Sequence, residues 1–379
     1  MNAMEYFGYL IRRERMKRGW SQEGLCKGIC AVSYLSKIEQ GKVRPAKEIV
    51  SLLAERLELK VQDAALGDLL SEGLDALFSE RLDNALKARL YEAADEGAMC
   101  SADFAVLLAA LRTKPADEAY EPFLSPRCLA LQRALQGRYA EAICIFPCAY
   151  LYLRAGRSAY EGGRFDALEL LQRAYDLAAA EGCPELMLDS RTLMGNYYSN
   201  LTDVRNMERH YAVAERLARS LNARVFLDTI AYNRAAVCLE TGDYAKAYAY
   251  FSEHAQNDKM HLQKLALCCE GLGRRDEALA ALDRAREAPC EAVEEALAAR
   301  MCDLVRFRLE HPDYLSDPAY GEALLGCFRD CRTKLPIGYA AFHLPWVLQW
   351  YQANRKYKQA YELIREFPLT LQIVELNSN

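Results

Sequence analysis

The side chains with the clearest chemical role lie in two phrases near the start of the chain. One phrase runs from Ser21 to Cys26 and the other from Ser33 to Gly41. Together they predict a helix, a tight turn and a second short helix, the arrangement that places side chains in the major groove of DNA. We expect these side chains to form hydrogen bonds with base edges and phosphates rather than to catalyse a covalent reaction.

Motifs of the common enzyme classes are absent from the sequence. The chain contains no HExxH, no phosphate-cradling glycine-rich loop and no G-x-S-x-G. Its 14 cysteines form no C-x-x-C, and the five histidines do not cluster with them. We therefore expect no enzyme activity, no metal and no cofactor. Pairs of cysteines four residues apart are expected as buried thiols, with redox sensing as the alternative: Cys26/Cys30, Cys144/Cys148 and Cys327/Cys331.

Four helices are expected to position the two phrases. The first covers Tyr6–Arg18 with Gly19 as its stop, and the second follows Ser21, whose hydroxyl caps it. The third covers about Val32–Gln40 and the fourth Ala46 to about Leu57. Their apolar residues predict a small core: Leu25, Cys26, Ile29, Leu35, Ile38, Ile49, Leu52, Leu53 and Leu57.

Residues 6–58 resemble the Xre (lambda-repressor-like) helix-turn-helix family. The features that carry the resemblance are Arg12-x-x-Arg15, Gly19-x-Ser21-Gln22-Glu23-x-x-Cys26, and Leu35-Ser36-x-Ile38-Glu39-x-Gly41 followed by Pro45. One departure is a turn before the third helix that looks one residue shorter than usual, with Cys30 where a glycine commonly sits. In similar domains a pair such as Arg15 and Glu39 forms a structural salt bridge, and we expect that role here.

The resemblance implies contacts with double-stranded operator DNA. The expected base readers are Val32, Ser33 and Lys37, because Lys37 can donate to guanine and Val32 can touch a thymine methyl group. Tyr34 is expected at a phosphate or in the packing of the head. The other expected phosphate contacts are Gln22, Gln40, Lys42, Arg44 and Lys47. Related domains bind as dimers on half-sites about 34 Å apart, so a homodimer is implied.

Charge separates the two ends of the chain. Residues 1–60 carry 12 of the 48 Lys and Arg but only 7 of the 53 Asp and Glu, so this head is basic and the remainder acidic. That asymmetry is typical of a DNA-binding module attached to a domain that does not bind DNA. The uncharged stretch 142–153 is too short to span a bilayer, and no signal peptide opens the chain. We expect a cytoplasmic protein with no membrane association.

A recurring phrase organises the rest of the chain. It places a small residue, an aromatic residue two positions later and another small residue three beyond that. Copies begin at Gly137, Gly163 and Gly242, with weaker ones at Thr202, Gly273, Pro318 and Arg355. The pattern is typical of stacked helical hairpins and resembles tetratricopeptide (TPR) repeats, nominally 34 residues long. We expect an all-α chain in which a right-handed superhelix with a concave groove follows the head.

These patterns predict three segments. Residues 1–60 form the DNA-binding domain, and residues 131–379 form a TPR-like domain for sensing and dimerisation. Residues 61–130 are helical in pattern without a clear repeat phrase, which leaves a linker helix or degenerate helical hairpins as the alternatives.

Alignment of the repeats on their turn residues suggests what lines the groove. Nine positions before a repeat glycine lie Arg154, Asn233 and Lys264; six positions before lie Arg157 and, relative to Thr202, Asn196. An Asn amide offers both a donor and an acceptor, which suits the backbone of an extended peptide. The alternative is that Asn196 and Asn233 only bond neighbouring helices.

The whole architecture resembles the RRNPP group of regulators, the Rgg- and PlcR-like proteins. In that group the repeats bind a short signalling peptide, and binding changes the spacing of two DNA-binding heads. The resemblance implies a peptide-switched transcriptional regulator in quorum sensing. One alternative is a TPR-like scaffold for a protein partner, with the head localising the complex. Another is an array that senses a small molecule.

Overall fold

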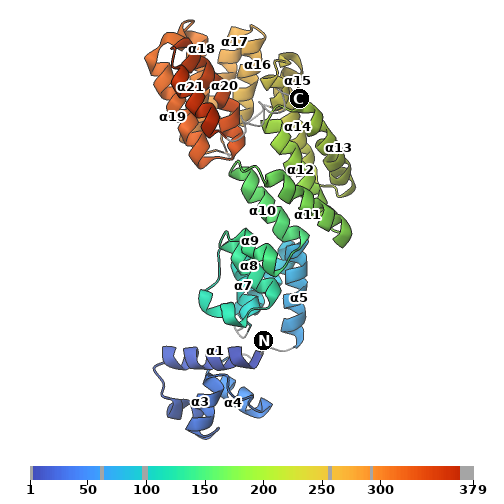
Figure 1. The fold of residues 1–379 in the computed structure, drawn as a ribbon, viewed down its shortest axis with the longest axis vertical. Coiled ribbons are helices and arrows are strands. Elements are labelled where there is room, and N and C mark those ends of the chain that lie inside the picture. The colour runs from blue at the N-terminus through green and yellow to red at the C-terminus, as the bar shows by residue number, and fades with distance from the viewer. Residues whose placement is uncertain (1–2, 60–63, 96–100, 255–257, 291–292, 368–379) are drawn as a thin grey trace. The chain divides into compact units, whose positions relative to one another are not determined.

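Helices and turns account for the described part of the chain. The computed structural model describes residues 3–59, 64–95, 101–254, 258–290 and 293–367, and within these ranges there is no strand, as the all-α prediction requires (Figure 1). The chain divides into two units: Met1–Ala155 with Asp176–Leu186, and Gly156–Tyr175 with Met187–Asn379. The expected boundary between residues 60 and 61 lies outside the described residues.

Four helices open the first unit: α1 (Ala3–Lys17), α2 (Gln22–Cys26), α3 (Val32–Glu39) and α4 (Lys47–Arg56). Ser21 caps α2 as predicted, since its Oγ accepts the N–H of Gly24 at 3.0 Å. The backbone turns with a φ of +67° at Gly19, just after α1, and of +77° at Gly28, before α3. The turn before α3 therefore has its positive-φ glycine at Gly28, two residues before Cys30, the position where similar domains commonly have a glycine.

The apolar faces of these helices close the core of the head. Its members are Phe7, Ile11, Leu25, Cys26, Leu35, Ile38, Leu53, Ala54 and Leu57. The sequence pattern also predicts Leu52 in this core, and that prediction is wrong because its side chain is 46% exposed. Leu53 and Leu57 define the buried face of α4, and Leu52 points roughly 100° away from Leu53 around the helix.

The first unit continues with α5 (Ala64–Phe78), α6 (Asn84–Asp95), α7 (Ala102–Leu111), the 3-10 helix η2 (Glu118–Phe123), α8 (Pro126–Leu135) and α9 (Tyr139–Ile145). α5 packs against α6 and α7, and α8 packs against α7 and α9. Gln132 of α8 is fully buried and bonds both backbone groups of Ala116, accepting its N–H at 2.9 Å and donating to its carbonyl at 2.8 Å.

α1 of the head contacts η2 within the same unit. Arg13 Nη1 donates to the hydroxyl of Tyr120 at 2.8 Å. The rings of Tyr6 and Tyr9 lie 5.4 and 5.1 Å from the ring of Phe123. These contacts join the head to the helices that follow it.

Helical hairpins build the second unit. The pairs are α12 (Pro184–Asn200) with α13 (Val204–Ser220), α14 (Arg224–Glu240) with α15 (Tyr244–His254), α16 (Lys259–Gly271) with α17 (Arg275–Glu287), α18 (Glu295–Glu310) with α19 (Pro318–Lys334), and α20 (Ile337–Ala353) with α21 (Tyr357–Glu366). The short 3-10 helix η3 (Tyr314–Ser316) precedes α19. Residues of α10 (Ala149–Glu161), α11 (Ala167–Glu181) and α12 are divided between the two units.

The recurring phrases mark the connections between paired helices. Six of their first residues take a φ between 53° and 85°: Gly137, Gly163, Thr202, Gly242, Gly273 and Arg355. The phrase at Pro318 differs because it opens α19, and the carboxylate of Asp317 caps that helix by accepting the N–H of Ala319. This copy therefore marks a helix start rather than a left-handed turn.

Small residues let neighbouring helices approach, as the repeat pattern predicts. A Cβ added at Gly195 would lie 2.2 Å from the ring of Tyr211, and one at Gly271 would lie 2.4 Å from the ring of Tyr244. Each ring therefore fills space that a glycine leaves open on the adjoining helix.

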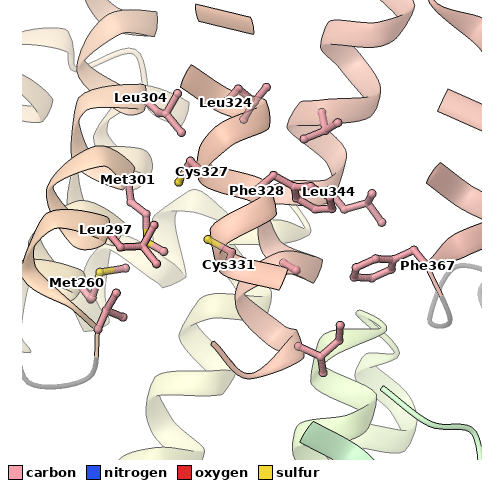
Figure 2. Close-up of a cluster of buried hydrophobic side chains, with 14 of the residues drawn as sticks. Met260, Leu297, Met301, Leu304, Leu324, Cys327, Phe328, Cys331, Leu344 and Phe367 are labelled. Atoms are coloured by element: carbon pink, nitrogen blue, oxygen red, sulfur yellow. The ribbon is translucent and has the colours of Figure 1, made fainter. Parts of the chain in front are cut away.

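One core of the second unit joins early and late helices. It brings Tyr197 of α12 and Leu201, which directly follows that helix, together with residues of α18, α19 and α20: Met301, Cys327, Cys331, Ala340 and Leu344. Figure 2 shows the sulfur atoms of Cys327 and Cys331 on the side of α19 that faces Met301. Because α20 shares this core with α12, the last hairpin packs against the first helices of earlier hairpins.

No disulfide joins the described cysteines, and most are buried, as expected for small apolar residues; Cys144 is exposed, contrary to that expectation. Burial raises the pKa of the Cys128 and Cys302 thiols to about 12. Within the described ranges, no three His, Cys, Asp or Glu residues come together as metal ligands. None of the described helices combines the length and apolar character needed to cross a membrane.

Candidate functional site

The face of the head predicted to read DNA is exposed. Val32, Ser33 and Lys37 all lie open to solvent on α3, and 42% of Val32 is accessible. Ser33 and Lys37 are four residues apart and share one face of the helix. Tyr34 is half-buried and packs against the core of the head, which agrees with its alternative role.

Basic side chains surround that face. Among the predicted phosphate contacts, Gln40, Lys42, Arg44 and Lys47 are exposed. In the part of the chain that the structure describes, no ion pair engages the three cations or Lys37. Their charge therefore remains available to phosphates.

A hydrogen-bond network behind α3 holds the head together. Arg15 donates to both oxygens of Glu39, at 2.6 and 2.9 Å, and to the carbonyl of Trp20 at 2.7 Å. The Glu39 carboxylate raises the pKa of Arg15 above its already high value. The predicted salt bridge is confirmed. Gln22 Nε2 donates to Glu39 at 2.8 Å, so one amide hydrogen of this predicted phosphate contact is already used.

A cavity of about 230 Å³ with a mixed polar and apolar lining lies in the second unit, lined by residues of α10, α12, α14, α16 and α20. Three of the predicted groove residues meet there: Asn196 of α12, Asn233 of α14 and Lys264 of α16. These are the first helices of three successive hairpins. The repeat alignment therefore places these residues on the helices that form one wall.

The two asparagines hold each other in a fixed orientation. Asn233 Nδ2 donates to Asn196 Oδ1 at 2.9 Å and to the hydroxyl of Tyr211 at 3.0 Å, and that hydroxyl donates to Asn196 Oδ1 at 2.8 Å. No described residue bonds to Asn196 Nδ2 or Asn233 Oδ1. The pair therefore bonds neighbouring helices and still offers one donor and one acceptor, which match the C=O and N–H of a peptide.

Lys264 places a buried ammonium in the cavity wall. Its side chain belongs to a residue that is 6% exposed, and Nζ lies 2.8 Å from the ring centroid of Phe342. Burial lowers the pKa of Lys264 to about 7, and the negative charge of Glu240 opposes this effect. Within the described residues, Lys264 has no hydrogen-bond acceptor and no carboxylate at ion-pair distance.

His343 adds a buried acceptor to the same wall. It is 1% exposed, and its Nδ1 lies 2.7 Å from the carbonyl of Tyr339, so Nδ1 carries the hydrogen. Burial lowers the pKa of His343 to about 4, which keeps the ring neutral at pH 7. Its Nε2 is buried and has no partner among the described residues. It can therefore accept a hydrogen bond from a ligand.

A second cavity of about 440 Å³ adjoins the first, and the two share Glu240 and Phe342. Its wall includes Tyr244 and Trp346. Arg308, which also lines it, donates to both oxygens of Glu270, at 3.2 and 2.8 Å, and lies 4.5 Å from the Trp346 ring centroid. Together the cavities reach the size of about 300–1,000 Å³ that is usual for ligand pockets.

Two predicted groove residues lie elsewhere. Arg157 forms an ion pair with Asp189, which is 4% exposed, because a buried carboxylate needs a partner. Arg154 belongs to the first unit, whereas the cavity belongs to the second. Neither lines the two cavities described above.

Sequence reasoning missed the residues that α20 contributes, which include Tyr339, Phe342 and His343. No local pattern predicts that this late helix faces α12. Two other lining residues did carry a signal. Asn200 follows Asn196 by four positions and Glu240 follows Asn233 by seven, the spacing of one helical face.

Comparison with known proteins identifies the head. A family model described as helix-turn-helix matches residues 11–63. No curated protein sequence matches the chain. One solved structure with some likeness is that of Bacillus thuringiensis PlcR in complex with the peptide PapR7 and DNA, at 15% identity and a TM-score of 0.32. The match covers 60% of this chain and 99% of that one.

Proposed function

We propose that this protein is a transcription regulator whose head binds operator DNA and whose second unit binds a short signalling peptide. The DNA part is supported by the helix-turn-helix match and by the exposed, basic face around α3. The peptide part is supported by one observation above all. Asn196 and Asn233 are locked so that a donor and an acceptor remain unused in the cavity of about 230 Å³.

The cavity chemistry suits an extended main chain. A peptide unit that bonds to Asn196 Nδ2 and Asn233 Oδ1 satisfies both groups without reorganising the pair. Such hydrogen bonds recognise the backbone of the peptide and do not distinguish one peptide side chain from another. Specificity then comes from the walls that Tyr232, Phe342 and the second cavity provide.

Regulation requires that the peptide favours one conformation of the protein. A ligand that bound all conformations equally would shift nothing. The first helices of three hairpins and α20 all contribute residues to the lining of the same cavity. A bound peptide therefore contacts both, and we propose that it changes how α20 packs against them. The resulting change in operator occupancy is the output.

The central experiment is a thermal-shift screen of the full chain against synthetic heptapeptides, followed by DNA-binding assays with each hit. A hit present at 100 times its Kd is expected to stabilise the protein by about 2.7 kcal/mol. Asn233→Ala should abolish that shift, because it removes both the acceptor and the bonds that orient Asn196.

The matched control is Asn206→Ala on α13, an asparagine that bonds Asp203 and does not line either described cavity. It should keep the peptide-induced shift. If no peptide stabilises the protein, and a large protein partner is retained in pull-downs instead, the peptide proposal fails and the scaffold alternative replaces it.

A further inference from the structure

We propose that the cavity around Lys264 is a receptor for a carboxylate group of the bound peptide. The carboxylate is either the free C-terminus or an Asp or Glu side chain. This inference rests on the proposed function, because it assigns the chemistry of one end of the same ligand.

The first step is the contrast between Lys264 and other buried cations of the second unit. Lys259, five residues earlier on α16, is 2% exposed and forms an ion pair with Glu295. Arg308 holds Glu270 through two hydrogen bonds. Lys264 is buried to a similar degree, yet the described residues supply only the ring face of Phe342 and the more distant charge of Glu240.

A buried ammonium without a counter-ion is costly, so an anionic group that arrives from outside would stabilise the charged form of Lys264. The Phe342 ring covers one side of Nζ, and Lys264 is among the residues that line the cavity. A carboxylate is the group that completes this environment with a charge-assisted hydrogen bond.

The surrounding groups distinguish a carboxylate from a more highly charged anion. Glu240 lines the same cavity, and burial raises its pKa to about 7; in its ionised form it would repel a dianion such as phosphate more strongly than a singly charged carboxylate. His343 Nε2 and Asn233 Oδ1 are acceptors, which suit the amide N–H next to a peptide carboxylate and would repel further phosphate oxygens.

We expect the binding of a carboxylate next to Lys264 to be accompanied by a measurable uptake of protons. Burial lowers the pKa of the free Lys264, and a neighbouring carboxylate raises it again. At pH 8, binding therefore takes up protons. The groups that face Lys264 and contribute to its titration are Glu240, Cys268, Cys331 and His343.

The test begins with selection of a binder by the full-length protein from a library of synthetic free-acid heptapeptides. Three forms of the selected peptide are then compared by calorimetry: the free acid, its C-terminal amide, and the free acid with each Asp or Glu replaced by Asn or Gln. One neutralised form should bind roughly 10–100-fold more weakly, and it identifies which carboxylate enters the cavity.

Variants of Lys264 complete the test. Lys264→Met should bind the charged and neutralised forms equally, and Lys264→Arg should keep the preference but lose proton uptake, because arginine stays protonated. Proton uptake is read from the dependence of the binding enthalpy on the ionisation enthalpy of the buffer at pH 8. Lys246→Met, at an exposed lysine on α15, is the matched control and should behave as wild type.

Two results overturn the inference while the proposed function survives. One is a selected peptide whose three forms bind within twofold of one another. The other is a Lys264→Met protein that still prefers the charged form. If the wild-type protein selects no peptide at all, the proposed function fails and this inference fails with it.

Discussion

At the scale of single residues, the head and the cavity use cations in different ways. Lys37 and Lys47 are exposed and form no ion pair among the described residues, so the DNA contacts that we propose for them would cost the fold little. Lys264 is buried without a counter-ion, so its charge weakens the fold that carries it. We therefore expect Lys264 to strengthen peptide binding and to lower the stability of the peptide-free protein.

That opposition predicts a stabilising substitution. Lys264→Met should raise the thermal midpoint of the peptide-free protein at pH 7 by roughly 2–4 °C, which corresponds to about 1 kcal/mol in a unit of this size. A residue whose charge stabilised the fold would give the reverse result. The measurement is differential scanning fluorimetry, with Lys246→Met as the surface control, expected within about 0.5 kcal/mol of wild type.

The pH dependence of this effect follows from the lowered pKa of Lys264. Between pH 7 and about 10.4 the unfolded state binds more protons than the folded state, so the stability of the wild type rises with pH across that window. The advantage of Lys264→Met should therefore be largest at pH 7 and below, and should shrink toward pH 10. A difference that is constant with pH would contradict the assignment.

In the head, Lys37 and Lys47 should separate base reading from phosphate binding. Lys37→Ala is expected to cost about 1–3 kcal/mol on the preferred operator and to relax specificity at one base pair. Lys47→Ala should weaken binding to all DNA sequences. It should also reduce the slope of the logarithm of affinity against the logarithm of salt concentration by about one. Fluorescence anisotropy on DNA selected from a random pool measures both, and equal effects of the two variants on all sequences would refute the distinction.

At the scale of elements, a few polar side chains hold short helices in place. α2 has five residues and α3 has eight, lengths that are unstable in isolation. Arg15 of α1 links them through Glu39 of α3 and Gln22 of α2. The position of α3, the proposed recognition helix, therefore depends on this network.

Arg15→Ala should unfold the head rather than change its specificity. It leaves the Glu39 carboxylate, 7% exposed, without its cation, at a cost of about 3–5 kcal/mol. Hydrogen exchange should show loss of protection in residues 6–58 while the second unit stays protected. The double variant Arg15→Met/Glu39→Leu should recover much of the protection. A folded Arg15→Ala head with altered operator preference would contradict this role.

At the scale of the whole molecule, one head presents too short a reading surface for a long operator, so we expect a homodimer. Light scattering should give twice the chain mass of 42.9 kDa. Because half-sites are expected about one helical turn apart, inserting five base pairs between them should sharply lower affinity. A complex with one chain per operator, insensitive to that insertion, would contradict the dimer.

Whether a feature could be predicted from the sequence depends on how far apart in the sequence its interacting residues lie. Ser21 as a cap and Arg15 with Glu39 were predictable because they belong to one compact motif. The connections at Gly242 and Gly273 were predictable because each hairpin repeats a local requirement for a turn. These interactions span few residues or recur.

The cavity was predictable only in part. Repeat alignment placed Asn196, Asn233 and Lys264 on the first helices of their hairpins. The rest of the lining includes residues of α20, and the position of that helix depends on a core that joins residues more than 100 apart in sequence. The ion pair of Arg157 with Asp189 was not predictable for a similar reason, since nothing local identifies Asp189 as its partner.

The position of Trp346 has a spectroscopic consequence. The chain has three tryptophans: Trp20 lies in the head, Trp350 is 5% exposed in the core, and Trp346 lines the second cavity beneath the guanidinium of Arg308. Indole emission responds to nearby charge and water. The protein thus carries an optical probe in the cavity wall, and with Trp20→Phe to remove the head's signal, ligand entry becomes visible in real time without any label.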